Sequence, residues 1–393
     1  MEAIRRIFLA LLKETDTTFK RTMEVNWQNR MIAITGARGV GKTTFLLQHI
    51  KENHPELNQV LYLSLDSLYF YDRELIELVD EFYQYGGRYL YLDEVHKYSH
   101  WSLALKNIYD NYPKLSIVFT SSSILDIYQG DADLSRRVVK YEMTGLSFRE
   151  YLLMEKIADL PILTLEQLLN NHEKIALNLP ENFQPLPHFK NYLKEGYYPF
   201  FNESDYLLKL LSALNNVIGM DLAKIENLSQ NKIEQIKKVL GVIAESVPFK
   251  PNITSLSQKL NINRDIILSM LYQLQKGRIL NLLSAPNKGV SVLQKPEKIY
   301  LENTNLMYAL KIQPEMGTIR ETFFLNQLTN SGSEINYSKQ TDFLVNVRYS
   351  FEIGGSKKGN RQILGLKNGF VIKDNITIGS QSTLPLWMFG LLY

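Results

Sequence analysis

A glycine-rich segment near the N-terminus has the residue types and the spacing that bind phosphate. Residues 36–43 read GARGVGKT and fit the pattern G-x-x-x-x-G-K-[ST] in full. Glycines let the backbone curl so that successive N–H groups point at phosphate oxygens. Lys42 adds a positive charge, and the Thr43 hydroxyl can ligate Mg²⁺. The predicted contacts to the nucleotide are Gly36, Ala37, Arg38, Gly39, Val40, Gly41, Lys42, Thr43 and Thr44.

Two carboxylates that follow a short apolar run are expected to complete this site. Asp93 and Glu94 come directly after the residues YLYL at 89–92. The carboxyl ends of parallel strands are where ligands of α/β proteins bind. We expect Asp93 to hold Mg²⁺ through water, and Glu94 to polarise the attacking water as general base. The Asp-Glu pair, without an N-K-x-D sequence for reading guanine, favours ATP over GTP and predicts an ATPase.

Further polar residues follow the next apolar run and are candidates for contact with the transferring phosphoryl group. A strand is expected at 116–120, and it ends in Thr120 and three serines. A polar residue at such a tip can orient the lytic water, and we choose Ser122, with Ser121 close behind. For each of them an ordinary serine-rich turn fits equally well. Arg136 and Arg137, after Asp133, can stabilise charge on the phosphoryl group in cis or from a neighbouring subunit. A solvated basic pair or an ion pair is the alternative for both.

Short apolar strands alternating with helices must position these residues. Strands are expected at 31–35, 60–65, 89–92 and 116–120, with helices between them and a helical stretch over 1–28. This order predicts an α/β fold, a P-loop NTPase domain over residues 1–150 with a parallel sheet and helices on both faces. A chain of 393 residues is too long for one core, and a helical lid or linker is expected over 151–228.

The next segment, 229–310, is expected to form a winged helix-turn-helix domain. Two helices joined by a polar turn cover 254–276, and a glycine-containing hairpin follows between residues 279 and 293. The second helix carries few basic residues on its outer face, so DNA binding and protein docking stay open as alternatives. The basic side chains available for phosphates are Arg264, Lys276, Arg278, Lys288 and Lys295.

Residues 311–393 are expected to form a small α+β domain. Glu321 on a helix, followed by Asp342 and Glu352 on adjacent strands, resembles the core of a PD-(D/E)XK nuclease. That chemistry needs two carboxylates on a metal and a lysine two positions after the glutamate. Gly354 stands at the lysine position, and the nearest lysines are Lys357 and Lys358. A displaced lysine can sometimes substitute by reaching in from a neighbouring position. We therefore expect a degenerate domain that does not cleave DNA, with an ATP-licensed nuclease as the alternative.

Several motifs together resemble a known family, the predicted AAA-superfamily P-loop ATPases of bacteria and archaea. The matching stretches are 34–44, 91–96, 118–123, 133–137, 141–151 and 196–199. The resemblance covers residues 1–210 well, and it implies an AAA-type fold with a helical lid, ATP and Mg²⁺. Ser121 stands where the family usually has glycine, which leaves the water-contacting residue of this strand open. The biological role is not implied.

Composition limits the remaining classes of function. The chain is 45% apolar and 22% charged, as in ordinary globular proteins, and it has no cysteine, which excludes disulfides, cysteine zinc sites and thiol catalysis. The net charge of +3 permits a polyanionic partner without requiring one. No signal-peptide pattern and no apolar run near the ~20 residues that span a bilayer are present, so a cytoplasmic protein without membrane contact is expected. Oligomerisation stays open.

Overall fold

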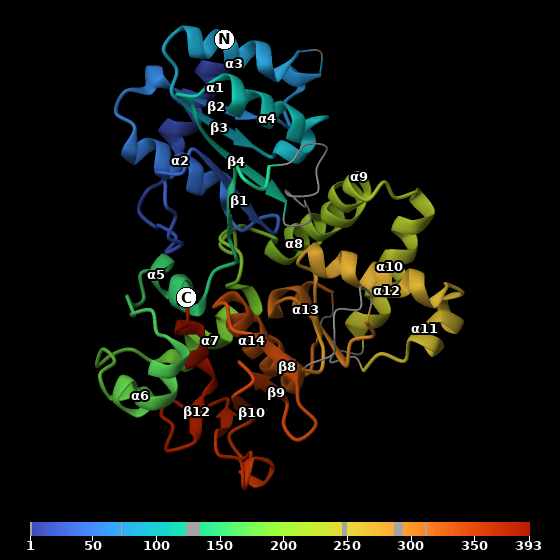
Figure 1. Ribbon diagram of the computed structural model, residues 1–393. Helices are drawn as coiled ribbons and strands as arrows, with labels where there is room; N and C mark the ends of the chain where they lie inside the picture. Colours follow the sequence, from blue (N-terminus) through green and yellow to red (C-terminus); the bar gives the residue numbers. More distant parts are fainter. Residues whose placement is uncertain (1, 72, 123–133, 246–249, 287–293, 311–312) are drawn as a thin grey trace. The chain divides into compact units, whose positions relative to one another are not determined.

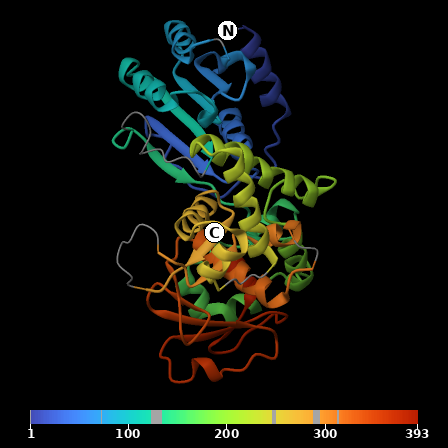
Figure 2. The same ribbon diagram turned by 90° about the vertical axis from the view of Figure 1, so that its right-hand side faces the viewer.

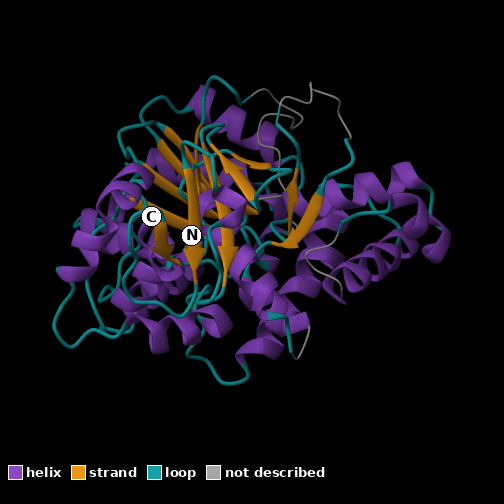
Figure 3. Cartoon of the chain, turned by 90° about the horizontal axis from the view of Figure 1, so that it is seen from below, coloured by secondary structure: helices purple, strands orange, loops and turns teal. Residues whose placement is uncertain are grey.

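The computed structural model divides into two compact units, Met1–Thr144 and Gly145–Tyr393 (Figure 1). It describes residues 2–71, 73–122, 134–245, 250–286, 294–310 and 313–393. The first unit holds the predicted nucleotide site, and the second holds the predicted winged helix and nuclease-like residues. Helices lie around the strands of the chain (Figure 3).

The first unit is built on a five-stranded sheet in which all paired strands are parallel. Its order is β2-β3-β4-β1-β5, which places β1 in the interior beside β4. The strands are β1 (Met31–Gly36), β2 (Val60–Ser64), β3 (Tyr89–Asp93), β4 (Ser116–Ser122) and β5 (Val139–Glu142). Every residue of β1 is buried, as expected for a parallel strand covered on both faces. The predicted α/β class with further domains at the C-terminal side is confirmed.

Helices cover both faces of this sheet, because right-handed crossovers send the chain to opposite faces when the strand order reverses. The helices are α1 (Glu2–Glu14), α2 (Lys42–Asn53), α3 (Leu75–Gln84) and α4 (Trp101–Asn111). Helix α1 packs on α2 and β2, whereas α3 packs on α4 (Figure 2). Short 3-10 turns lie at η1 (Leu57–Gln59), η2 (Leu68–Phe70) and η3 (Val95–Lys97).

Two expectations for this unit are wrong. The first helix ends at Glu14 and does not continue to residue 28. The side chain of Gln48 donates to the backbone carbonyls of Asp16 (2.7 Å) and Phe19 (2.8 Å), so these carbonyls bond to α2 and not along a helix. Strand β4 runs to Ser122, two residues past its expected end, because its polar last residues still pair with the buried β1.

The second unit begins with helices and ends in a mixed sheet. The helices are α5 (Phe148–Met154), α6 (Leu165–Leu177), α7 (Pro185–Glu195), α8 (Tyr206–Asn216), the π-helical turn η4 (Val217–Leu222), α9 (Ala223–Ile225), α10 (Gln230–Glu245), α11 (Ile253–Leu260), α12 (Arg264–Lys276), α13 (Thr304–Leu310) and α14 (Met316–Asn330). Side-chain caps define several starts, such as the capping boxes of Ser147 with Glu150 and of Thr164 with Gln167.

A two-stranded antiparallel hairpin follows α12 and joins β6 (Leu280–Leu283) to β7 (Lys298–Leu301). The expected second hairpin strand, between 288 and 293, falls on residues 287–293, outside the described part of the chain, as does Lys288. The described partner of β6 is β7, which lies further along.

The last sheet has the order β12-β11-β10-β9-β8 and packs on α14. Its strands are β8 (Ile335–Tyr337), β9 (Phe343–Val345), β10 (Tyr349–Gly354), β11 (Gly369–Lys373) and β12 (Thr383–Pro385), with 3-10 turns η5 (Arg361–Ile363) and η6 (Leu386–Leu391). Strands β8, β9 and β10 pair antiparallel, and β10, β11 and β12 pair parallel. Within the described residues, no helix has the length and apolar character needed to cross a membrane.

Candidate active site

The glycine-rich loop joins β1 directly to the first turn of α2, as predicted. Gly41 precedes α2 with φ 97°, in the left-handed region that favours glycine, and no side chain caps this helix start. A Cβ atom on Gly36 would lie 2.2 Å from the Met143 carbonyl oxygen, so only glycine fits there. The uncapped first turn of α2 thus presents its N–H groups beside the loop, where an anion is favoured.

Lys42 is buried and folded back over this loop. Its Nζ donates to the backbone carbonyls of Gly36 (3.0 Å) and Ala37 (3.1 Å). These carbonyls hold the ammonium group at the mouth of the loop, within reach of an anion that the loop amides would bind. The structure therefore places the ammonium group of Lys42 where phosphate oxygens can replace the two neutral carbonyls as its hydrogen-bond partners.

Arg21 joins the loop to the chain segment after β5, and nothing in the sequence singled it out. Its guanidinium donates to the Val40 carbonyl (2.9 Å) and to the Thr144 carbonyl (2.9 Å). The donor lies outside every motif and far from both acceptors in the sequence. Only the fold brings these three residues together, so no local signal was available.

Asp93 collects three hydroxyl groups at the end of β3. It accepts hydrogen bonds from Thr43 (2.7 Å), from Tyr62 (2.9 Å) and from Thr120. The side chain is nearly buried, with the residue only 3% exposed. Burial, and secondarily the charge of Asp93, raises the pKa of Tyr62, so that the phenol stays protonated and donates. Thr43 and Asp93, the two predicted Mg²⁺ residues, are therefore in direct contact.

These oxygen atoms fit a magnesium ion by their chemistry. Mg²⁺ is bound in proteins through one or two carboxylates and hydroxyls together with substrate phosphates and water. The hydroxyl of Thr43 and the carboxylate of Asp93 converge beside the start of α2, where those phosphates would lie.

Glu94 follows Asp93 in an unusual backbone conformation. Its φ is 56°, in the left-handed region, and its N–H donates to the Thr120 hydroxyl (2.9 Å). The carboxylate oxygen Oε2 lies 3.3 Å from Nε2 of His96, and the side chain is 25% exposed. Glu94 is therefore open to solvent, as a base that activates water must be. The neighbouring Asp93 is enclosed, which suits a carboxylate that binds a cation.

The polar residue of β4 that hydrogen-bonds to this pair is Thr120, whereas Ser122 was predicted to orient the lytic water. The Thr120 hydroxyl donates to Asp93 and accepts from the Glu94 backbone. Ser122 is buried two residues further along, and its backbone N–H donates to His96 Nδ1 (3.4 Å). Thr120 is the first polar residue after the apolar run at 117–119, and this position was the signal that could have identified it.

The two predicted arginines lie in a turn before β5. Arg137 forms a two-pronged ion pair with Asp110 of α4, at 2.9 and 3.0 Å, which is the alternative that the sequence left open. Arg136 is exposed. Ser123 and Asp133, which belong to the same motifs, lie outside the described residues.

Comparisons with known proteins agree with this geometry in the first half of the chain. Residues 28–152, from just before β1 into α5, match the model of a family described as an AAA domain. A protein of Methanocaldococcus jannaschii described as uncharacterized is 26% identical over 396 aligned positions, which cover 91% of this chain and 82% of that protein. The match supports an AAA-type P-loop ATPase domain, and the expected winged-helix and nuclease-like regions lie outside residues 28–152.

Solved structures give only distant likenesses. C. elegans PCH-2 aligns at a TM-score of 0.27 with 15% identity, over 70% of this chain and 67% of that one. DnaA from Aquifex aeolicus, solved with AMPPCP bound, aligns at a TM-score of 0.26 with 16% identity, over 70% of this chain and 88% of that one. TM-scores this low carry no information about function.

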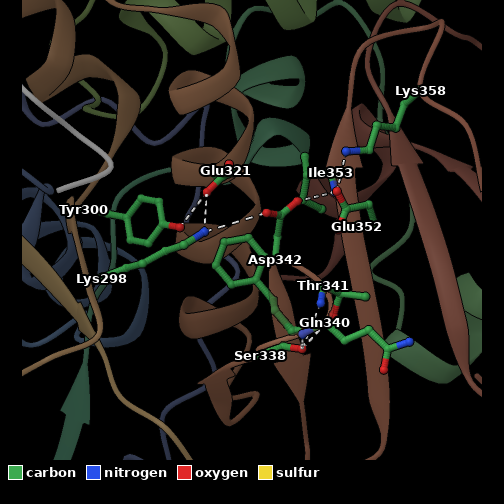
Figure 4. A network of polar contacts seen from close by, with 11 residues as sticks. Lys298, Tyr300, Glu321, Ser338, Gln340, Thr341, Asp342, Glu352, Ile353 and Lys358 are labelled. Atoms are coloured by element: carbon green, nitrogen blue, oxygen red, sulfur yellow. Dashed lines mark hydrogen bonds and ion pairs between the residues drawn. The ribbon is translucent and has the colours of Figure 1, made fainter. Parts of the chain in front are cut away.

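A second group of ionisable side chains lies in the other unit and contains the three predicted nuclease-like residues (Figure 4). We call Lys298, Glu321, Asp342, Glu352 and Lys358 the acid–lysine cluster. Nζ of Lys298, from β7, lies 3.3 Å from Glu321 Oε2 and 3.7 Å from Asp342 Oδ1. Nζ of Lys358 pairs with Glu352 Oε1. Each carboxylate therefore has a lysine ammonium beside it.

Gly354 explains how a lysine reaches Glu352 although none stands at the expected position. A Cβ atom on Gly354 would lie 2.6 Å from the side chain of Lys358. The glycine thus leaves the space through which Lys358 crosses to Glu352. Burial raises the pKa of Glu352, and the hydrogen bond from Lys358 opposes this shift.

A metal ion does not fit the acid–lysine cluster as the cluster stands. Burial raises the pKa of Glu321, and the charge of Asp342 adds to this shift while Lys298 opposes it. Lys298 occupies the space between the two carboxylates where a cation would bind. Across the described ranges, no three or more histidine, aspartate or glutamate side chains are arranged to hold a metal.

Proposed function

We propose that the first unit binds ATP and hydrolyses it with Mg²⁺. The observation that carries the proposal is the 2.7 Å contact between Thr43, at the end of the P-loop, and Asp93, at the tip of β3. It joins two motifs, fifty positions apart, that are predicted independently to hold the same cation. The family match over residues 28–152 supports the same reading.

Each residue then has a chemical task. The loop amides and Lys42 hold the β- and γ-phosphates, and Thr43 and Asp93 hold Mg²⁺, which when bound neutralises phosphate charge. Glu94 takes a proton from water as the water oxygen bonds to the γ-phosphorus. The bond from this phosphorus to the oxygen that bridges it to the β-phosphorus breaks, and ADP leaves with that oxygen. We assign Thr120, in place of Ser122, to fixing Asp93 and the backbone of Glu94.

Nucleotide binding is tested separately from turnover by replacing Lys42. The Lys42→Ala variant loses its ammonium, so retention of labelled ATP should fall at least tenfold, while Lys51→Ala on the same helix serves as a control with intact binding. Equal retention by the Lys42→Ala variant and the wild-type protein would remove the basis of the proposal.

We further propose that hydrolysis is coupled to the segment 230–301, which forms a winged-helix module that binds a protein partner. The supporting observation is the exposed start of α12, where Arg264 lies next to Asp265 and Ile266 is 41% exposed. Balanced charge beside an exposed apolar side chain favours protein over the uniformly basic surface that DNA requires. A gel shift with duplex DNA at low salt, with and without ATP, tests the alternative, because a salt-sensitive shift would favour DNA.

We do not propose cleavage of nucleic acid at the acid–lysine cluster. Each of its three carboxylates already has one of the two lysines beside it, and Lys298 fills the cation position. An ATP-licensed nuclease would need that position to open. Incubating supercoiled DNA with the protein, ATP and Mg²⁺ or Mn²⁺ should therefore leave the DNA intact, and nicking would contradict this reading.

A further inference from the structure

His96 is a buried polar residue directly behind Glu94 that the proposed mechanism has not used. It lies in the short turn η3, and its side chain is only 1% exposed. One ring nitrogen, Nε2, lies 3.3 Å from the Glu94 carboxylate, and the other, Nδ1, faces the backbone N–H of Ser122 at 3.4 Å. The ring therefore lies between the end of β4 and the proposed base. Burying an imidazole is costly unless its nitrogens have partners. Nδ1 accepts a hydrogen bond, and Nε2 approaches the Glu94 carboxylate outside hydrogen-bond geometry.

The contact with Ser122 fixes the tautomer of this ring. A backbone N–H can only donate, so Nδ1 of His96 must accept. In a neutral imidazole the remaining proton then resides on Nε2, which is the nitrogen that faces Glu94. The contact with β4 thus turns the N–H side of the ring toward one oxygen of the carboxylate, at 3.3 Å and outside hydrogen-bond geometry.

Glu94 is consequently held at two points. Thr120 accepts the hydrogen bond of its backbone N–H, which supports the left-handed φ of 56°. His96 contacts Oε2 at the other end of the side chain. In active sites a catalytic base is generally oriented by a third group. If the carboxylate rotates away from the water, the rate of the reaction falls although the substrate still binds.

We infer that His96 is a positioning residue for ATP hydrolysis, which fixes one carboxylate oxygen of Glu94 so that the second oxygen meets the attacking water. This inference rests on the proposed ATPase function. In this role His96 acts through Glu94 and not directly on the nucleotide or the metal. Its loss should therefore lower turnover and leave nucleotide affinity unchanged.

The test compares His96→Ala and His96→Gln with the control His100→Ala, an exposed histidine in the same unit. Phosphate release gives kcat, and titration with a fluorescent non-hydrolysable ATP analogue gives affinity. We expect His96→Ala to lower kcat about 10- to 100-fold, the size of a misplaced catalytic group, with affinity unchanged. His96→Gln should recover part of the rate, because its amide N–H can donate to Glu94, and it also serves if the alanine variant does not fold.

A double-mutant comparison separates positioning from stability. In a Glu94→Gln background, His96→Ala should lower the single-turnover rate no further, since the group that His96 positions is already gone. The inference would be overturned if both His96 variants released phosphate at the wild-type rate or faster. It would also be overturned if nucleotide affinity fell in these variants together with their Tm. If wild-type protein released no phosphate, the proposed function itself would fail. If Glu94→Gln lowered turnover while both His96 variants kept the wild-type rate, only the role of His96 would be refuted.

Discussion

Replacing Thr120 by valine keeps the volume of a buried side chain and removes its hydroxyl. That hydroxyl donates to the Asp93 carboxylate and accepts the N–H of Glu94 at 2.9 Å. A hydrogen bond to a charged group contributes about 1.5–3 kcal/mol, and a buried N–H left without a partner costs about 1–3 kcal/mol. Because the neighbouring Glu94 side chain is 25% exposed and water can reach part of the site, we expect a loss near the lower end, about 3 kcal/mol.

The same change should lower turnover, since the backbone of Glu94 loses the contact that supports its left-handed φ. We expect kcat for ATP hydrolysis to fall about 10- to 100-fold in Thr120→Val, with nucleotide affinity largely kept. Urea unfolding gives the stability, and phosphate release at saturating ATP gives kcat.

Two control variants sharpen this comparison. Thr120→Ser retains the hydroxyl, so it should lose about 1 kcal/mol for the missing methyl group and keep most of its rate. Ser122→Ala retains the backbone N–H that faces His96 and should also keep most of its rate. The reasoning is refuted if Thr120→Val turns over like wild type, or if Ser122→Ala loses as much rate as Thr120→Val does.

Three further outcomes follow from other parts of the structure. Gly36→Ala places a Cβ 2.2 Å from a backbone oxygen, so its ATP affinity, measured by equilibrium titration, should fall at least tenfold. As a control, Gly241→Ala in the middle of α10, where the added Cβ meets no other atom, should bind ATP normally and be more stable by up to about 1 kcal/mol. Burial, followed by the charge of a neighbouring histidine, lowers the pKa of His49 in the folded state to about 4, so stability should be full above pH 6.5 and fall as the pH drops from 6.5 toward 4. His49→Gln should flatten that part of a Tm-against-pH curve, and an unchanged slope would contradict it. Lys298→Met leaves the carboxylates of Glu321 and Asp342 together without the lysine and should lower the free energy of unfolding in urea by about 2–4 kcal/mol. A recovery of stability on adding Mg²⁺ or Mn²⁺ would show that a cation can replace the lysine.

The first unit could be predicted well because its chemistry depends on local patterns. The P-loop pattern and the apolar run before Asp93 each specify a strand, a turn and the residue types at its end. The end of β4 was missed, because pairing with a buried neighbour extends a strand through polar residues that the sequence alone assigns to a turn. Thr120 was passed over for that reason.

Contacts between distant parts of the chain could not be predicted. Arg21 reaches Val40 and Thr144 only because the sheet order places β1 next to β5. The pairing of Lys358 with Glu352 is local, and Lys358 was already one of the two nearest lysines in the sequence. Its path across the space that Gly354 leaves open could not be predicted, because it depends on the backbone conformation of this segment. In both cases a long, flexible basic side chain reaches a partner that the sequence pattern does not specify.

Turnover in the presence and absence of Glu94 tests the central claim most directly. Purified protein should release phosphate from ATP only when Mg²⁺ is present, and Glu94→Gln should bind ATP with unchanged affinity while its kcat falls at least 100-fold. Phosphate release by Glu94→Gln at the wild-type rate would contradict the account.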